Sequence, residues 1–266
     1  MQLIDIGINL AHSSYDADRE AVIARARAAG VCQMIVTGSD MASIARAVEL
    51  VRQHPGVLSA TAGIHPHHAA EHDAAATAAL KAWLVQPEIC AAGECGLDYY
   101  RNYSPRDAQR ASFRTQLEIA ADLARPVFLH QRDAHQDFIA LVREFRPRLP
   151  GAVAHCFTGG VKEARACLDL DLHIGITGWI NDERRGRHLA EVVRFVPANR
   201  LMLETDGPYL LPRDLKPKPA TRRNEPMYLP HVLAAVAAAR GESLEELAAS
   251  TTRTARKFFG LPEPPS

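Results

Sequence analysis

The sequence predicts an α/β protein folded as a (β/α)₈ TIM barrel. Short apolar segments with strand character alternate with longer amphipathic segments of helical period, which is typical of a parallel sheet covered by helices. Eight such units fit into the 266 residues, and about 250 residues is the usual length of this barrel. An open doubly wound sheet is the alternative, but it would favour a glycine-rich phosphate turn after the first strand, which residues 5–10 lack.

The first half of the chain contains four of the predicted strands. Each is a short apolar or β-branched run, and a helical segment follows each one. Gly30 ends the first helix and the turn His54-Pro55-Gly56 ends the second, because these residue types stop helices. The predicted strands are 3–8, 33–37, 58–63 and 89–93, and the predicted helices are 18–29, 41–53, 74–85 and 106–124.

The second half of the chain repeats the alternation after the break at Arg125-Pro126. The last helix begins after Ser243, which forms a capping box with Glu246, and Gly260 is its predicted stop. The predicted strands are 127–130, 152–155, 173–177 and 201–204, and the other predicted helices are 134–145, 162–170, 188–195 and 227–240.

The overall charge excludes one class of nucleic-acid-binding protein. The chain has 31 Lys+Arg against 31 Asp+Glu and a formal net charge of +0, so no long-range basic field can hold nucleic acid. A local basic groove is still compatible with this balance. The twelve histidines are a first indication of chemistry, since histidine is the commonest metal ligand.

Features of membrane and secreted proteins are missing from the sequence. No apolar run approaches the roughly 18–20 residues that span a bilayer, and the first residues do not form a signal-peptide pattern. We therefore expect a cytoplasmic protein with no membrane partner. No low-complexity linker divides the chain, so we expect a single domain over 1–260 and a loose proline-rich tail over 261–266.

The five cysteines are odd in number and form no C-x-x-C pair, which favours reduced thiols over disulfides or a zinc ribbon. Cys95 and Cys156 each follow a candidate ligand, Glu94 or His155, by one residue. Because successive side chains of a strand point to opposite faces, we expect both thiols to be buried away from the site.

Chemically active side chains follow five of the eight predicted strands. His65, Glu94, His130, His155 and Asp206 stand at strand ends, where a barrel brings them to one rim. A single histidine after a strand is usually only a hydrogen-bonded residue, whereas five such residues on one rim indicate a site. We interpret Glu94, His130 and His155 as metal ligands, Asp206 as ligand or general base, and His65 as ligand or hydrogen-bond partner of a phosphate.

Imidazole and carboxylate together suit Zn²⁺ or Mn²⁺, whereas Mg²⁺ would favour the carboxylates and keep more water. A carboxylate beside the metal can also take a proton from water, so Glu94 and Asp206 are the predicted catalytic residues.

A basic segment follows the eighth strand. Residues 213–223 contain five basic residues and one acidic residue, a local charge of +4, and the prolines make the segment an extended loop. A charged run is usually a solvated connector, but a place beside the predicted pocket favours phosphate binding. The substrate-binding candidates in this loop are Arg213, Lys216, Arg222 and Arg223.

Other substrate-binding candidates come directly after the strand ends. Arg101 and Arg132 lie shortly after predicted ligands and can contact phosphates, and His67 stands two residues beyond His65. Several aromatic residues also follow strand ends and either stack on unpaired bases or simply pack: Tyr99, Tyr100, Tyr103, Trp179 and Tyr209.

Six motifs together resemble those of the TatD-type metal-dependent deoxyribonucleases, a branch of the amidohydrolase-like metal-dependent hydrolases. They are DIGINL at 5–10, TAGIHPH at 61–67, GECGLD at 93–98, HCFTG at 155–159, ETDGPYL at 204–210 and RRNEP at 222–226. They occur in order along nearly the whole chain, so the resemblance is highly specific.

The resemblance implies a (β/α)₈ fold and a hydrolase that depends on a divalent metal, with Mg²⁺ first and Mn²⁺ or Zn²⁺ as alternatives. It also implies 3′→5′ exonuclease action on single-stranded DNA and RNA, in DNA repair or nucleic-acid turnover. The metal-binding positions of the family fall on Glu94, His130 and His155. Its active-site Asp falls on Asp206 and its His before Pro falls on His65.

The chain departs from the family pattern at three places. Many relatives carry a metal-binding His-x-His pair on the first strand, where this chain has Gly7 and Asn9, so one metal position is weakened or built differently. One branch of the family shares this gap. Thr254 replaces a usual Asn and Gly207 a common Ala, with little expected consequence.

Two other functions are compatible with these residues. The same site in a deacylase would attack the carbonyl of an aminoacyl-tRNA or of a small amide or ester, although a small neutral substrate has no need of the basic loop. A non-enzymatic partner in protein export is the second, but a scaffold gains nothing from costly polar groups in a pocket. The sequence predicts no protein partner.

Overall fold

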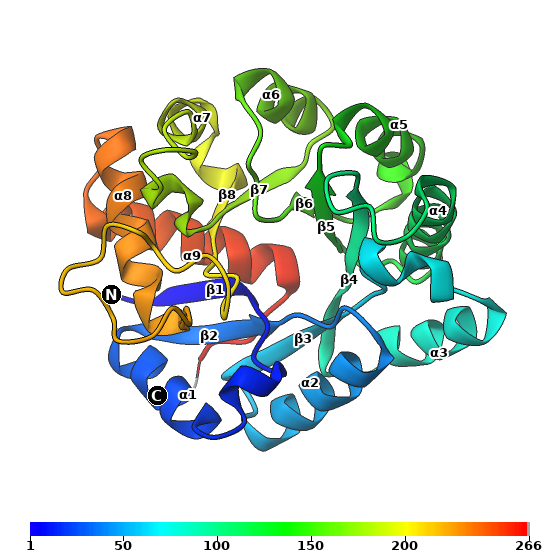
Figure 1. Ribbon diagram of the computed structural model, residues 1–266, viewed down its shortest axis with the longest axis horizontal. Coiled ribbons are helices and arrows are strands. Elements are labelled where there is room, and N and C mark those ends of the chain that lie inside the picture. The colour runs from blue at the N-terminus through cyan, green and yellow to red at the C-terminus, as the bar shows by residue number, and fades with distance from the viewer. Residues whose placement is uncertain (265–266) are drawn as a thin grey trace.

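Eight parallel strands form one sheet in the computed structural model, which describes residues 1–264 (Figure 1). Neighbours in the sheet are consecutive in the chain. The strands are β1 (Leu3–Ile8), β2 (Val31–Val36), β3 (Leu58–Ala62), β4 (Ile89–Asp98), β5 (Val127–Arg132), β6 (Ala152–Ala154), β7 (His173–Ile176) and β8 (Leu201–Leu203).

The sheet closes into a barrel where the chain after β8 meets β1. The amide of Asp206 donates to the carbonyl of Gly7 at 2.8 Å, and the amide of Asn9 donates to the carbonyl of Gly207 at 2.8 Å. The predicted (β/α)₈ barrel is therefore confirmed, and the open doubly wound sheet is excluded.

The helices surround the barrel (Figure 1). Within residues 1–264, none of them has both the length and the apolar character needed to cross a membrane. They are α1 (Arg19–Ala28), α2 (Met41–Gln53), α3 (Ala74–Leu84), α4 (Arg106–Asp122), α5 (His135–Phe145), α6 (Val161–Asp169), α7 (Leu189–Phe195), α8 (Leu229–Arg240) and α9 (Leu244–Phe259). The capping box at Ser243 and the left-handed stop at Gly260 are both present, as predicted.

One predicted boundary is wrong. The strand expected to end at Gly93 continues to Asp98, whereas every other predicted end lies within two residues of the observed one. Gly93 and Gly96 have φ angles of +139° and +147°, and a Cβ at either position would overlap a carbonyl oxygen of β5. Glycine thus lets β4 approach β5 closely instead of ending the strand. Because β4 continues past Gly93, Glu94 belongs to the strand and lies inside the barrel.

The barrel interior has its own apolar core, separate from the larger core between strands and helices. Inward side chains of several strands, among them Ile6, Phe128 and Met202, pack with Phe259 of α9 at the N-terminal end of the barrel. Phe128 is fully buried, and its ring centroid lies 6.5 Å from that of Phe259. Layers of apolar side chains of this kind fill the interior of (β/α)₈ barrels.

The start of the predicted tail is packed against the barrel. Leu261 is buried in the interior core, and the carbonyl of Pro262 accepts a hydrogen bond of 2.9 Å from the Gln33 amide. These contacts correct the expectation of a loose tail for Leu261 and Pro262, because Leu261 supplies an apolar side chain where α9 ends. Residues 265–266 of the predicted tail lie outside the described residues.

Candidate metal centre and active-site pocket

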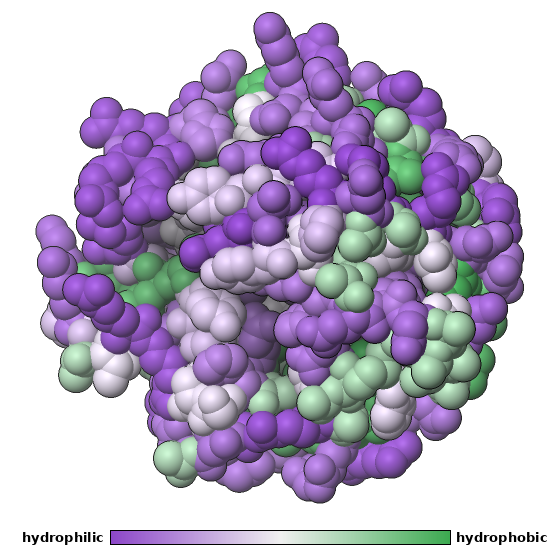
Figure 2. Space-filling model, turned by 45° about the vertical axis from the view of Figure 1, so that its right-hand side comes forward, coloured by the Kyte–Doolittle hydropathy of each residue, from purple (hydrophilic) through white to green (hydrophobic). Residues whose placement is uncertain are grey.

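A pocket of about 1080 Å³ opens at the C-terminal ends of the strands. Its wall includes all five of the predicted strand-end residues, His65, Glu94, His130, His155 and Asp206. Figure 2 shows the molecule hollowed near the middle of this side, with hydrophilic side chains around much of the hollow. The barrel thus brings together residues that are up to 141 positions apart in the chain (65 to 206), as the strand-end pattern predicted.

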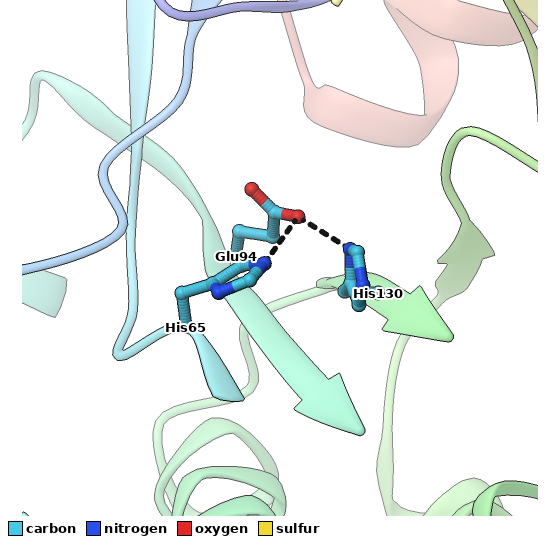
Figure 3. A group of neighbouring side chains, drawn as sticks. All are labelled: His65, Glu94 and His130. Carbon is cyan, nitrogen blue, oxygen red and sulfur yellow. Dashed lines mark hydrogen bonds and ion pairs between the residues drawn. The ribbon is translucent and has the colours of Figure 1, made fainter. Parts of the chain in front are cut away.

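Glu94 is the centre of a histidine cluster at the base of this pocket. Its Oε1 lies 2.9 Å from Nδ1 of His130, 2.8 Å from Nε2 of His155 and 3.4 Å from Nε2 of His65. Figure 3 shows the side chains of His65 and His130 converging on Glu94. One ligand atom from each of these three residues lies within 4.8 Å of the others, close enough for a shared metal ion or for direct hydrogen bonds to Glu94.

The protonation of Glu94 and His155 is strongly coupled. Burial acts to raise the pKa of Glu94, but His155 and His65 outweigh it and hold the pKa well below its usual value. Burial likewise acts to lower the pKa of His155, and the negative charges of Glu94 and Glu204 outweigh it and raise that pKa. The Glu94 carboxylate is therefore negatively charged although it is buried, as a metal ligand must be.

Asp206 lies just after β8 with a left-handed backbone (φ 55°) and faces the same pocket. Burial raises its pKa to about 7, against the opposing effect of His155, and the repulsion of Glu94 adds to the rise. Its Oδ1 accepts a hydrogen bond of 3.1 Å from the Asn9 side chain. A carboxyl group that titrates near neutral pH can take up and release a proton during catalysis.

The structure gives a steric reason for Gly7. A Cβ at this position would lie 2.5 Å from Oε2 of Glu204 and 3.0 Å from the Phe128 ring, so a larger side chain there would require Glu204 to move. Asn9, the other departure from the His-x-His pair, hydrogen-bonds Asp206 instead.

Two buried carboxylates of the site were missed by the sequence analysis. Oδ2 of Asp98 lies 2.8 Å from His67 and 3.6 Å from Nε2 of His130. Oε2 of Glu204 lies 3.2 Å from Nδ1 of His155. Both residues belong to the motifs that carry the family resemblance, and both are carboxylates at strand ends, so the signal was available.

The donors around Glu94 fit a divalent metal. Nδ1 of His130 and Nε2 of His155 both face Oε1 of Glu94, at 2.9 and 2.8 Å, so two imidazole nitrogens and a carboxylate oxygen converge on one point. His155 directs Nδ1 to a carboxylate, the arrangement by which proteins orient a metal-binding histidine. Two imidazoles and a carboxylate are a common ligand set for divalent metals in hydrolases.

The predicted substrate-binding residues fall into two groups. His67, Arg101 and Arg132 line the pocket, whereas none of the four candidates in the loop after β8 does. The pocket wall follows the chain after β8 only as far as Leu210, so substrate binding by this loop stays a prediction. The sequence analysis also missed Arg46 on this wall.

Arg223 has structural partners. Its guanidinium lies 2.7 Å from Asp18 and 2.8 Å from Glu225, and Arg25 pairs with the same two carboxylates. Arg213 stands 3.8 Å from Asp182. Asp18, just before α1, and Asp182 are distant in the sequence, so a charge run read along the chain did not reveal them as partners.

The two cysteines beside the cluster differ from each other. Cys95 is fully buried, as predicted. Cys156 instead lines the pocket, with its sulfur 3.7 Å from Oγ1 of Thr177, so the expectation that it faces away from the site was wrong. The strand β6 ends at Ala154 and Cys156 has a φ of +44°, so the alternation of strand side chains does not apply to it. Burial raises the pKa of this thiol well above its usual value.

Comparison with known proteins places the chain in a family. The sequence profile of the family described as "TatD related DNase" matches residues 4–260. A Klebsiella pneumoniae (strain 342) protein named "3'-5' ssDNA/RNA exonuclease TatD" is 51% identical over 259 residues, which cover 97% of this chain and 98% of the relative. A Salmonella typhimurium protein with the same name is 50% identical over 257 residues, with coverage of 97% and 98%.

A solved structure agrees with this relationship. The crystal structure of YJJV, a TatD homologue from Escherichia coli K12, matches with a TM-score of 0.89 at 27% identity and covers 98% of both chains. The profile match and the full-length relatives together show that this chain belongs to the TatD-related DNase family.

Proposed function

We propose that this chain is a divalent-metal-dependent hydrolase that cleaves phosphodiester bonds and removes nucleotides 3′→5′ from single-stranded DNA and RNA. The observation that carries the proposal is the convergence of Glu94, His130 and His155 at the base of a pocket whose wall also holds Asp206. The names of the full-length relatives supply the substrate and the direction.

Glu94, His130 and His155 are the residues that would hold the metal. Asp98 faces Nε2 of His130, and Glu204 faces Nδ1 of His155. This leaves Nδ1 of His130 and Nε2 of His155 for a metal beside Glu94. A divalent ion bound there polarises a phosphoryl oxygen and makes water more acidic. Family membership implies such an ion. We propose Mg²⁺ first, and Mn²⁺ or Zn²⁺ next because imidazole nitrogens suit them.

His65 has a different role from the other two histidines. Its Nδ1 accepts the backbone N–H of His67 at 3.1 Å, so a neutral ring carries its proton on Nε2. Burial lowers the pKa of His65 to about 4, which keeps the ring neutral. Of the two roles predicted for His65, we therefore choose the hydrogen-bond donor to a phosphate oxygen over the metal ligand.

Asp206 is proposed to take the proton of the attacking water, since its pKa of about 7 suits proton transfer near neutral pH. Arg101, Arg132 and His67 are proposed to hold phosphates inside the pocket. Outside the pocket, Arg213, Lys216 and Arg222 remain candidate contacts for the strand beyond its end.

The test is digestion of a single-stranded oligonucleotide labelled at either end. A 3′→5′ exonuclease releases the 3′ label first as a mononucleotide and shortens the 5′-labelled strand stepwise. We expect both patterns with Mg²⁺ or Mn²⁺ and none in EDTA. Asp206→Asn should slow the reaction by about 10²- to 10⁴-fold. Equal rates for this variant and the unchanged chain would contradict the proposal, as would faster turnover of aminoacyl-tRNA than of DNA.

We further propose a cytoplasmic role in DNA repair or nucleic-acid turnover. The support is the kind of substrate named for the relatives, single-stranded DNA and RNA. Cell fractionation of a tagged chain tests the location, and sensitivity of a deletion strain to DNA damage tests the role in repair.

A further inference from the structure

Tyr100 lies on the pocket wall with an arginine against one face of its ring. The guanidinium carbon of Arg132 is 3.8 Å from the ring centroid, and that of Arg101 is 6.0 Å away. Tyr100 is nevertheless 58% exposed. A tyrosine ring that stays more than half exposed beside a cation presents aromatic surface to a ligand.

The two arginines keep their charge available. Neither Arg101 nor Arg132 forms an ion pair with a carboxylate of residues 1–264, whereas Arg46, another arginine of the pocket wall, pairs with Asp16 at 2.6 Å. An unpaired guanidinium against an aromatic ring can serve a nearby phosphate and strengthen stacking on the ring at the same time.

Asp98 connects this aromatic group to the metal centre. Its Oδ1 accepts the backbone N–H groups of Tyr100 at 3.0 Å and of Arg101 at 2.8 Å. Its Oδ2 lies 2.8 Å from His67 and 3.6 Å from His130, and the residue is only 1% exposed. One buried carboxylate therefore fixes the backbone of Tyr100 at a set place relative to a proposed metal ligand.

We infer that Tyr100, backed by Arg132, is a stacking platform for one unpaired nucleobase of the strand whose phosphate lies at the Glu94 cluster. This inference rests on the proposed function and extends it, because the chain then recognises a base as well as the phosphates. In a duplex both faces of an internal base are covered by its neighbours, so the platform selects single-stranded ends. Tyr103, 66% exposed on the same loop, is outside the pocket wall. Its ring packs edge-on against His67 at 4.7 Å, and within residues 1–264 no arginine lies over it.

The experiment measures binding of short labelled single strands by fluorescence anisotropy in EDTA, where no hydrolysis interferes. A set of strands carries one abasic nucleotide at each position counted from the 3′ end. Tyr100→Ala should weaken binding of the intact strand about 5- to 150-fold. It should have little further effect on the strand whose abasic site removes the stacked base.

Tyr100→Phe should bind like the unchanged chain because the ring is kept, and Tyr103→Ala is the matched control, with a change below about 2-fold. Thermal melting of each variant checks folding. The inference is overturned if Tyr100→Ala binds all strands like the unchanged chain, or if its effect is the same on intact and abasic strands. Absence of any binding by the unchanged chain overturns it too.

The result also separates this inference from the proposed function. If Tyr100 controls base-dependent binding but the chain releases no nucleotide with any divalent metal, the platform stands and the nuclease proposal fails. If the chain degrades the strand and Tyr100→Ala binds and degrades it equally well, the nuclease stands and the platform is overturned.

Discussion

Two layers of the barrel interior differ in chemistry although the same strands build them. On β5, Phe128 belongs to the apolar layer and His130, two residues later, to the histidine cluster. The chain passes in the same way from Val153 of β6 to His155, which directly follows this strand. Two residues advance a strand by about 6.6 Å, so the change from apolar core to buried charge occurs within one step along the barrel axis.

The comparison shows that stability and chemistry occupy adjacent layers of one core. The apolar layer, here the lower layer, removes apolar surface from water, which stabilises the fold. The histidine cluster around Glu94, here the upper layer, holds charged groups out of water, which costs free energy unless they are paired. Phe128 lies at the boundary, with its ring centroid 4.5 Å from that of His155 and 6.5 Å from that of Phe259.

The largest effect is expected from Glu94→Gln in the upper layer. The change keeps the shape of the side chain but removes the negative charge that faces three histidines. We expect a loss of about 10³-fold or more in nucleotide release, equal to about 4 kcal/mol of transition-state stabilisation. Calorimetric titration should show a parallel loss of metal affinity. Glu20→Gln, an exposed change on α1, is the control, and full activity of Glu94→Gln would remove the upper layer from the chemistry.

The next effect is expected from Phe128→Ala in the lower layer. The fully buried ring packs in the interior core, and its removal should lower the free energy of unfolding by about 3–5 kcal/mol. Phe128→Leu, which fills most of the volume, should lose less than about 1.5 kcal/mol. Denaturant unfolding measures both values. A loss below about 1 kcal/mol for the alanine variant would break the comparison, because the lower layer would then contribute little stability.

The sequence predicted the two layers unequally. Strand periodicity and strand-end position identified Glu94, His130 and His155, because a parallel barrel brings all strand ends to one rim. Asp98 and Glu204 also stand at strand ends, but the ring nitrogen that each one faces belongs to a histidine at another strand end, which no local pattern reveals.

The sequence analysis also stopped β4 at Gly93. Glycine usually weakens a strand, and only the tertiary structure shows that β5 approaches too closely for any other residue. The basic loop shows a different limit of the sequence. Its charge could be counted, but the pairing of Arg223 with Asp18, a residue 205 positions away, depends on the tertiary structure.

A smaller effect is expected at the seam between β1 and the chain after β8. Asp5 is fully buried there and accepts hydrogen bonds from the amide and hydroxyl of Thr205. Burial raises its pKa from 3.8 to about 7, so the folded state binds a proton more tightly than the unfolded state. The stability contribution of Asp5 is therefore greatest below about pH 4 and is lost as the pH rises through 7.

Asp5→Asn should remove this pH dependence, because an amide does not titrate and can still pair with Thr205. Denaturant unfolding of the metal-free chain at several values between pH 4 and 8 measures the difference between the two proteins. The gap should change by a few kcal/mol at most across this range, in favour of the variant at high pH. If the free energy of unfolding changed with pH in the same way for the two proteins, the pKa of Asp5 would not be raised in the folded state.

The smallest effect is expected from Arg223→Ala, which compares an arginine of the basic loop with an arginine of the pocket wall, Arg132. Arg223 pairs with Asp18 and Glu225 and lies outside the pocket wall, so its removal should lower the melting temperature by at most about 4 °C. Nucleotide release should stay within about 2-fold, whereas Arg132→Ala, inside the pocket, should weaken strand binding and its dependence on salt. If Arg223→Ala instead loses activity without losing stability, the loop contacts the substrate, and substrate-binding cations then extend beyond the pocket wall.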